Sequence, residues 1–292
     1  MKKKLKFFAP LTIVSLLWIG YSCGKKETPP PSSPTGKDCL ENVKGSKFNL
    51  FLVSKDVELG AQTEIEILSN PSEYPILDSA THTNTYKFLY AMRDEILNSG
   101  QLTYKNEFKW KLKIIHDDST LNAFCTPGGY IFVYTGLIKY LDTEDQLAGV
   151  LGHEIAHADK RHSTEAMTKE YPLLITTSVS GLSKSTIAGF VTNLIRLGYS
   201  RDNEAEADAY SVVYLSKTKY KCSAGGGFFE KLVKDGMDPC GSNPLAKYTS
   251  THPCPDNRVQ NFNTIGSCYE CTGREVGTSA YNAFKNSIPK SN

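Results

Sequence analysis

Hydrophobic and polar positions along this chain repeat mainly with a helical period. Four segments place apolar residues three or four positions apart, which predicts amphipathic helices. They are residues 53–68, 83–98, about 201–216 and 226–235. In the second segment, Phe88, Leu89, Met92 and Ile96 lie on one face, so that face is expected to be buried.

Two other segments have the composition or the alternation of a β-strand. Residues 108–118 (FKWKLKIIHDD) set Trp110, Leu112 and Ile114 between lysines, which indicates a half-exposed strand. Residues 130–134 (YIFVY) are rich in strand-forming side chains and follow a Pro-Gly-Gly turn. These segments predict a small antiparallel sheet within a mainly helical α+β fold.

The best-marked helix contains the stretch VLGHEIAHADKRH, residues 150–162. Asp142 or Thr143 can cap its start, and Thr143 with Gln146 fits a capping box. Acidic residues at positions 144 and 145 suit the positive end of the helix dipole. The expected buried stripe consists of Leu147, Val150, Leu151 and Ile155.

The segment 172–199 is largely apolar, but Gly181, Lys184 and Arg196 interrupt it. A helix that spans a bilayer needs about 20 predominantly apolar residues. A pair of buried helices is therefore the expected structure of this segment.

The first 23 residues have the pattern of a bacterial lipoprotein signal peptide. A basic start, MKKKLK, precedes the apolar stretch FFAPLTIVSLLWIG, which is too short for a comfortable membrane span. The resemblance implies cleavage before Cys23 and lipidation of its thiol, which would tether the protein to a membrane. Gly20 and Tyr21 depart from the usual pattern, so an ordinary signal peptide or an uncleaved anchor stays an alternative.

A proline-rich stretch follows the predicted signal peptide. Residues 24–38 contain four prolines and few apolar side chains, which predicts an extended linker. From residue 39 onward the composition is that of a globular protein, so residues 39–292 are expected to form one domain.

Charge and composition narrow the range of partners. Apolar residues make up 40% and charged residues 22%, as in ordinary globular domains. The net charge is +2, and no long basic run occurs after the first residues. A nucleic acid is therefore not an expected partner.

Seven cysteines follow Cys23, and five of them lie in the last 71 residues. In an exported protein this crowding indicates disulfides that hold a loop-rich C-terminal region, although the pairing cannot be read from the sequence. Because seven is odd, one thiol should stay free, and Cys125 in its apolar stretch is the expected one. A zinc knuckle or a redox pair at Cys268 and Cys271 is a less favoured alternative, since no second pair of this spacing follows.

The pattern HEIAH places His153 and His157 one helical turn apart on the same face, where both can bind one metal ion. Glu154 stands beside the first histidine and can accept a proton from a water on that metal. An HExxH pattern also arises by chance in roughly one chain in a hundred of this size, so the hypothesis needs a third ligand.

The third ligand is not expected to be the nearest histidine. His162 lies five residues after His157, so on a continuing helix it points well away, and Lys160, Arg161 and His162 are interpreted as a polar, exposed helix end. Glu204 and Asp208 share one face of a later helix, where one carboxylate can bind the metal and the other can hydrogen-bond a ligand histidine. Glu206, by the same spacing, points elsewhere.

The motif SRDNEAEAD, residues 200–208, resembles an element of the zinc endopeptidases related to HtpX and the CAAX prenyl proteases, which are of the minigluzincin type. Residues 48–60 (FNLFLVSKDVELG) and 121–137 (LNAFCTPGGYIFVYTGL) resemble two further elements of this family, in the same order. The similarity covers most of residues 48–260 and is closest to the soluble, exported BepA/LoiP-like branch, which works on outer-membrane assembly and quality control.

The resemblance implies a zincin-like metalloprotease domain that holds one Zn²⁺ per chain. Its zinc ligands would be His153, His157 and Glu204, with Glu154 as general base. Asp208 would orient a ligand histidine.

Two further elements are assigned by resemblance. The stretch THPCPDNR contributes His252, which would stabilise an oxyanion or occupy the fourth zinc position, and Arg258, which would support the site by pairing with a carboxylate. A loop histidine and a surface arginine are the plain alternatives. Substrate-binding residues would be Asn122, Ala123 and Phe124, beside a strand edge that pairs with extended peptides, although Phe124 also suits a core.

The sequence therefore favours a zinc endopeptidase of the cell envelope. Its expected substrates are misfolded or unassembled envelope proteins. The protein is expected to be held by a lipid anchor at the periplasmic face or in the outer membrane of a Gram-negative-type bacterium. The envelope assembly machinery is an expected partner there. The competing hypothesis is a zinc-binding chaperone or assembly factor with little proteolytic turnover.

Overall fold

The computed structural model describes residues 39–41, 43, 45, 48–170, 198–238, 252, 257–271 and 278–291. The predicted signal peptide, the linker and Cys23 lie outside these residues, and so does nearly all of the apolar segment 172–199. Within the described part, no helix is long and apolar enough to cross a membrane.

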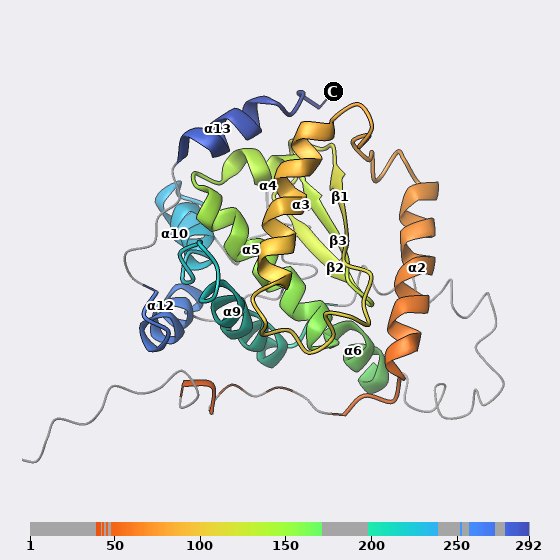
Figure 1. Ribbon diagram of the computed structural model, residues 1–292, viewed down its shortest axis with the longest axis vertical. Coiled ribbons are helices and arrows are strands. Elements are labelled where there is room, and N and C mark those ends of the chain that lie inside the picture. Colours follow the sequence, from red (N-terminus) through yellow and green to blue (C-terminus); the bar gives the residue numbers. More distant parts are fainter. Residues whose placement is uncertain are drawn as a thin grey trace, which may run out of the picture. The chain divides into compact units, whose positions relative to one another are not determined.

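A three-stranded sheet forms the middle layer of the fold (Figure 1). Its strands are β1 (Lys111–Ile115), β2 (Ala123–Thr126) and β3 (Tyr130–Tyr134), in the spatial order β1-β3-β2. β2 and β3 are antiparallel, whereas β1 runs parallel to β3. The prediction of an antiparallel sheet is therefore wrong for β1. The β2–β3 hairpin follows from a local turn. Alternation of apolar residues, however, does not determine that β1 lies beside β3 and runs parallel to it.

Helices surround this sheet and make up most of the described residues. They are α2 (Val53–Ser69), α3 (Thr83–Leu97), α4 (Thr135–Tyr140), α5 (Glu144–Asp159), α6 (His162–Glu170), α9 (Arg201–Leu215), α10 (Gly226–Lys234), α12 (Arg258–Cys268) and α13 (Thr278–Asn286). The four helices predicted from apolar spacing correspond to α2, α3, α9 and α10, with ends that agree within one or two residues. The mainly helical α+β prediction is confirmed.

The two faces of the sheet are buried against different layers. One face packs into the main helical core, through side chains such as Leu112, Cys125 and Ile131. The other face forms a smaller, aromatic cluster with α2, which includes Phe124 and Phe132. Figure 1 shows α2 on one side of the sheet and α3 and α5 on the other.

The β2–β3 turn depends on two glycines. Gly128 and Gly129 have φ angles of 74° and 83°, in the left-handed region where a side chain is strained. α2 also passes close to this turn, because a Cβ atom on Gly60 would lie 1.9 Å from the carbonyl oxygen of Pro127. The turn and the helix therefore fit together only through small residues.

α5 is the central helix and is buried along its whole length. The predicted capping box is confirmed: the Thr143 hydroxyl accepts a hydrogen bond from the Gln146 backbone N–H, and the Gln146 side chain accepts one from the Thr143 N–H. α5 packs along α9 at glycine positions, where the Ser211 hydroxyl donates to the Gly149 carbonyl over 2.8 Å. The two helices that carry the candidate site thus lie in close contact.

Two disulfides hold the C-terminal region. Cys39 pairs with Cys268 and Cys222 pairs with Cys271, so the CxxC pair forms two bridges rather than one redox pair. Among the described cysteines only Cys125 is free, and it is buried, as predicted.

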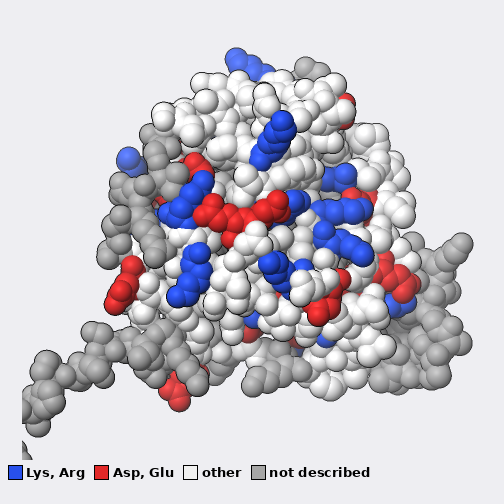
Figure 2. Space-filling model, viewed as in Figure 1, with Lys and Arg blue, Asp and Glu red and all other residues white. Residues whose placement is uncertain are grey.

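Acidic and basic side chains are interspersed on the face seen in Figure 2. Side chains on α3 take part in ion pairs: Arg93 lies 2.7 Å from Asp94, and Glu95 lies 3.7 Å from Lys219. Among the described residues, Figure 2 shows no large patch of a single charge on this face.

Candidate metal centre

The centre begins on α5, where one helical turn separates the two histidines of HEIAH. His153 and His157 are almost fully buried, and their Nε2 atoms lie 2.9 Å apart. Helical spacing explains this convergence, because side chains at i and i+4 lie above one another on the same face. Two lone-pair donors are thus directed at the same point.

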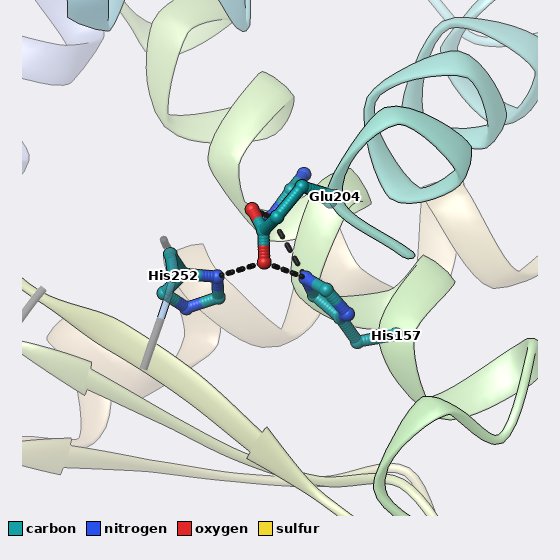
Figure 3. A group of neighbouring side chains, drawn as sticks. His157, Glu204 and His252 are labelled. Carbon is teal, nitrogen blue, oxygen red and sulfur yellow. Dashed lines mark hydrogen bonds and ion pairs between the residues drawn. The ribbon is translucent and has the colours of Figure 1, made fainter. Parts of the chain in front are cut away.

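α9 brings a carboxylate to these imidazoles. Ser200 caps this helix by accepting a hydrogen bond from the Asn203 N–H, and Glu204 lies in the first turn. The Glu204 carboxylate is completely buried, 3.4 Å from Nε2 of His153 and 3.4 Å from Nε2 of His157. Figure 3 shows this carboxylate between the imidazoles of His157 and His252.

His252 completes the cluster from a different part of the chain. Its side chain is fully buried, and its Nδ1 lies 3.1 Å from Oε1 of Glu204. One ligand atom from each of His153, His157, Glu204 and His252 lies within 4.8 Å of the others. The sequence alternative of a surface loop histidine does not fit this burial.

Glu154 stands beside the cluster without joining it. Its carboxylate is completely buried, and neither oxygen has a hydrogen-bond partner among the described residues. Oε1 lies 3.5 Å from Nε2 of His252. Burial raises the pKa of the Glu154 carboxyl, and the neighbouring histidines oppose this shift only in part.

Asp208 and Arg258 support the cluster from behind. Oδ1 of Asp208 lies 2.9 Å from Nδ1 of His153, on the side of the ring that faces away from His157. Arg258 binds Asp208 through two nitrogens and also contacts Glu204 at 3.1 Å. Arg258 is only 5% exposed, so the alternative of a surface arginine does not fit either.

The shifts in pKa within this cluster reflect its burial and its dense charges. Burial alone lowers the pKa of His153, but hydrogen bonds to Asp208 and Glu204 outweigh it and raise that pKa to about 9. Burial and the neighbouring His153 hold the pKa of His157 well below its usual value. For Glu204, burial is outweighed by the nearby His252 and His157, which lower its pKa.

These residues fit a divalent cation in both geometry and charge. Two atoms bonded to one zinc ion at about 2.0–2.1 Å in tetrahedral geometry lie roughly 3.3 Å apart. Four contacts within the cluster are 2.9, 3.4, 3.4 and 3.1 Å, and one ligand atom from each residue lies within 4.8 Å of the others. In the form that would bind a metal, with the histidines neutral and the carboxyls ionised, Glu154, Glu204 and Asp208 carry a formal −3 against the +1 of Arg258, which leaves −2. Because burying uncompensated charge is costly, a divalent cation is the natural complement.

The interpretation of residues 160–162 as an exposed helix end is wrong. α5 ends at Asp159, and Arg161 adopts a left-handed φ of 60°, which turns the chain before α6 begins. His162 is completely buried as a result, and its Nδ1 lies 2.8 Å from Nδ1 of His157. It stays outside the candidate metal cluster, as expected, but it contacts the far side of the His157 ring.

Sequence reasoning missed Tyr199 as a neighbour of His157 and Glu206 as a neighbour of His162. The ring of Tyr199 stacks on His157 with centroids 3.8 Å apart, and Glu206 contacts His162 at 3.0 Å. Glu206 does point away from Glu204 and Asp208, as predicted, and it contacts His162. The prediction for His162 assumed that the helix continues past residue 159. Neither Lys160 nor Arg161 is a glycine or proline that would indicate a break there.

The three predicted substrate-binding residues lie at the start of the edge strand β2. Asn122, Ala123 and Phe124 are all buried, and Phe124 belongs to the aromatic cluster beneath α2. The Asn122 carbonyl accepts a hydrogen bond from the Tyr134 N–H. In an antiparallel pair these bonds alternate, so the backbone groups of Ala123 are directed to the outer side of β2.

Two helical histidines, a carboxylate from a second helix and a buried glutamate beside them define a metallopeptidase-type centre. Residues 91–265 match the sequence model of Peptidase family M48, and these residues are more than half of the chain. The chain belongs to peptidase family M48.

Relatives of this chain occur in bacteria and in mitochondria. The mitochondrial metalloendopeptidase OMA1 of Arabidopsis thaliana is 32% identical over 151 residues, which is 51% of this chain and 30% of the relative. The beta-barrel assembly-enhancing protease of Escherichia coli K12 is 29% identical over 275 residues, which is 89% of this chain and 52% of the relative. This chain therefore spans about half the length of these relatives or less.

Proposed function

We propose that this protein is a zinc-dependent endopeptidase of the cell envelope. The observation that carries the proposal is the buried convergence of His153, His157, Glu204 and His252, with the carboxylate of Glu154 beside them. Nitrogen and oxygen donors in tetrahedral number suit zinc. Membership in family M48 supports a catalytic metal at this place.

A bound zinc ion would supply a water of lowered pKa and would polarise the scissile carbonyl. Glu154 is the general base in this proposal, and it takes a proton from the attacking water and delivers it to the leaving amine nitrogen. Its raised pKa suits this exchange, because a carboxyl that titrates nearer neutral pH both accepts and releases a proton.

His153, His157 and Glu204 would hold the metal. Asp208 would fix the ring of His153 through Nδ1, and Arg258 would hold Asp208 and Glu204 in place. His252 would take the fourth metal position until substrate displaces it. Its Nδ1 lies 3.1 Å from Glu204, which supports this role. Stabilisation of an oxyanion is the alternative role.

The edge strand β2 is the proposed platform for an extended substrate. A peptide that pairs with this strand would use the outward backbone groups of Ala123, between Asn122 and Phe124. Main-chain pairing of this kind recognises extended or unfolded segments with little dependence on sequence, which fits misfolded and unassembled proteins as substrates.

The cellular setting is part of the same proposal. Residues 1–23 would act as a lipoprotein signal, Cys23 would carry the lipid, and residues 24–38 would link the anchor to a domain at 39–292. Two disulfides suit an oxidising envelope. One relative is named a beta-barrel assembly-enhancing protease, which supports envelope proteins and their assembly machinery as partners.

A test of the activity compares the full-length protein with Glu154→Gln. Metal content is measured by mass spectrometry, and cleavage is measured with unfolded casein. We expect about one zinc per chain in both proteins and a loss of 10²–10⁴-fold in cleavage rate in the variant. Zinc in both proteins with equal, negligible cleavage would instead favour the zinc-binding chaperone or assembly factor.

A test of the anchor compares the wild-type protein with Cys23→Ser in a Gram-negative host. We expect the wild type to incorporate radiolabelled palmitate and to be found in the membrane fraction. The variant should lose both properties. Equal labelling of the two proteins would contradict lipidation at Cys23.

A further inference from the structure

His162 and Glu206 form a buried chain of contacts behind the ligand His157. The left-handed turn at Arg161 folds His162 back, so that its Nδ1 lies 2.8 Å from Nδ1 of His157. On its other side, Nε2 of His162 lies 3.0 Å from Oε2 of Glu206. His162 is fully buried, and the Glu206 side chain is 13% exposed. Three side chains from α5, α6 and α9 are thus joined in one line.

The direction of these hydrogen bonds follows from the nitrogen that faces the metal cluster. Nε2 of His157 lies 3.4 Å from Glu204 and 2.9 Å from Nε2 of His153, so it must keep its lone pair in order to bind a cation. Its hydrogen is then on Nδ1, which donates to Nδ1 of His162. His162 must in turn carry its hydrogen on Nε2, which donates to the carboxylate of Glu206.

We propose that His162 and Glu206 are a positioning relay that fixes the tautomer and ring orientation of His157 for metal binding. This inference rests on the proposed function, since it assumes a metal at the centre. Histidine ligands commonly donate their second N–H to a carboxylate or carbonyl. His153 does so directly with Asp208, whereas His157 reaches its carboxylate through a second histidine.

The residues around the relay restrict the orientation of the His157 ring. The ring of Tyr199 stacks on His157 and fixes its plane, and the Tyr199 hydroxyl is held near Ser163 at 3.1 Å. A Cβ atom on Gly45 would lie 2.2 Å from Oε1 of Glu206, so the backbone there covers the outer end of the relay. Removing His162 would take away the hydrogen-bond partner of the buried Nδ1 of His157, and a buried polar group without a partner is costly.

The experiment measures metal affinity as well as activity. Full-length wild type, His162→Ala, Glu206→Ala and Glu206→Gln are titrated with Zn²⁺ against a chelator of known affinity. The same proteins are loaded with Co²⁺, whose visible absorption reports the geometry of its ligands. Casein cleavage is then followed at saturating Zn²⁺.

Tyr214→Phe is the matched control. It removes a buried hydrogen bond of 2.7 Å between α9 and Asp159 at the end of α5, in the same region but without contact to a ligand. Thermal unfolding of each metal-free variant shows whether it has folded.

We expect His162→Ala and Glu206→Ala to bind Zn²⁺ about 10–100-fold more weakly and to change the Co²⁺ spectrum. Glu206→Gln should stay within about threefold of the wild type, because its amide oxygen still accepts from His162. Tyr214→Phe should match the wild type in affinity and spectrum.

Two outcomes would overturn the relay: folded His162→Ala with wild-type affinity and spectrum, or equal loss in the Tyr214→Phe control. A failure of the proposed function would look different, because the wild type itself would then bind no zinc or would cleave nothing. If His162→Ala does not fold, the contrast between Glu206→Ala and Glu206→Gln decides, and equal affinities in these two would also overturn it.

Discussion

Gly149 on α5 lies against the loop before α10, and its substitution should damage both the fold and the candidate site. A Cβ atom at this position would lie 2.3 Å from the backbone nitrogen of Gly225 and 2.4 Å from its Cα. Ordinary contact begins near 3.4 Å, so helix and loop would have to separate by roughly 1 Å. Both obstacles are backbone atoms, so no side chain can swing away.

The magnitude follows from two opposing terms. Overpacking of a tight core costs about 1–3 kcal/mol, and rigid backbone on both sides favours the upper end. Alanine regains about 1 kcal/mol of helix propensity over glycine. We therefore expect Gly149→Ala to lower the free energy of unfolding by about 2 kcal/mol.

The effect on the site should exceed the effect on stability. Gly149 lies one turn before His153, and the ligand distances of a metal site are expected to lie within about 0.2 Å of their usual values. A shift of roughly 1 Å should thus weaken zinc binding and reduce casein cleavage by about 100-fold.

Urea unfolding and zinc titration of the same preparations measure the two effects. Gly227→Ala is the control, because the three atoms nearest its Cβ belong to the Gln146 side chain, the closest at 2.9 Å, and a side chain can shift where a backbone cannot. It should change stability by less than about 1 kcal/mol. Wild-type stability and affinity in Gly149→Ala would refute the argument.

Three further predictions concern stability and the thiols. Partial burial raises the pKa of Asp118, but hydrogen bonds from Lys139, Thr135 and Ser291 outweigh it and lower that pKa to about 2. A depressed folded-state pKa stabilises the fold at neutral pH, so Asp118→Asn should cost up to about 2 kcal/mol in urea unfolding at pH 7. Most of that cost should be gone near pH 2, where about half of the folded-state carboxyl is protonated, and an equal cost at both pH values would contradict this. Burial raises the pKa of the Cys125 thiol, so peptide mapping after iodoacetamide should find it unlabelled in the native protein and labelled in urea; rapid native labelling would contradict its burial. The Cys222–Cys271 bridge closes 49 residues, so replacing both cysteines with alanine should lower stability by about 2–4 kcal/mol, and an unchanged urea midpoint would argue against the pairing.

The parts of the fold with a strong local signal were predictable from the sequence. The apolar face of α3, the capping box of α5 and the burial of Cys125 each depend on neighbouring residues, and each is confirmed. The convergence of His153 and His157 also follows from helical spacing alone.

Other features depend on contacts that a local pattern does not encode. The parallel pairing of β1 with β3 and the two disulfide pairings are set by tertiary packing. The burial of His162 depends on one left-handed residue, Arg161, that has no glycine or proline to mark it. Sequence spacing treated the helix as straight and therefore placed a buried histidine at the surface.

The Cys39–Cys268 bridge also determines how a pull on the N-terminal side would enter the domain. The bridge joins residues 229 positions apart, at the start of the described chain and at the end of α12. Tension from a tether ahead of residue 39 would pass through this covalent link into α12, bypassing α2 and the sheet that α2 covers. A pull on that tether would therefore reach the domain at α12 without first loading α2 or β2.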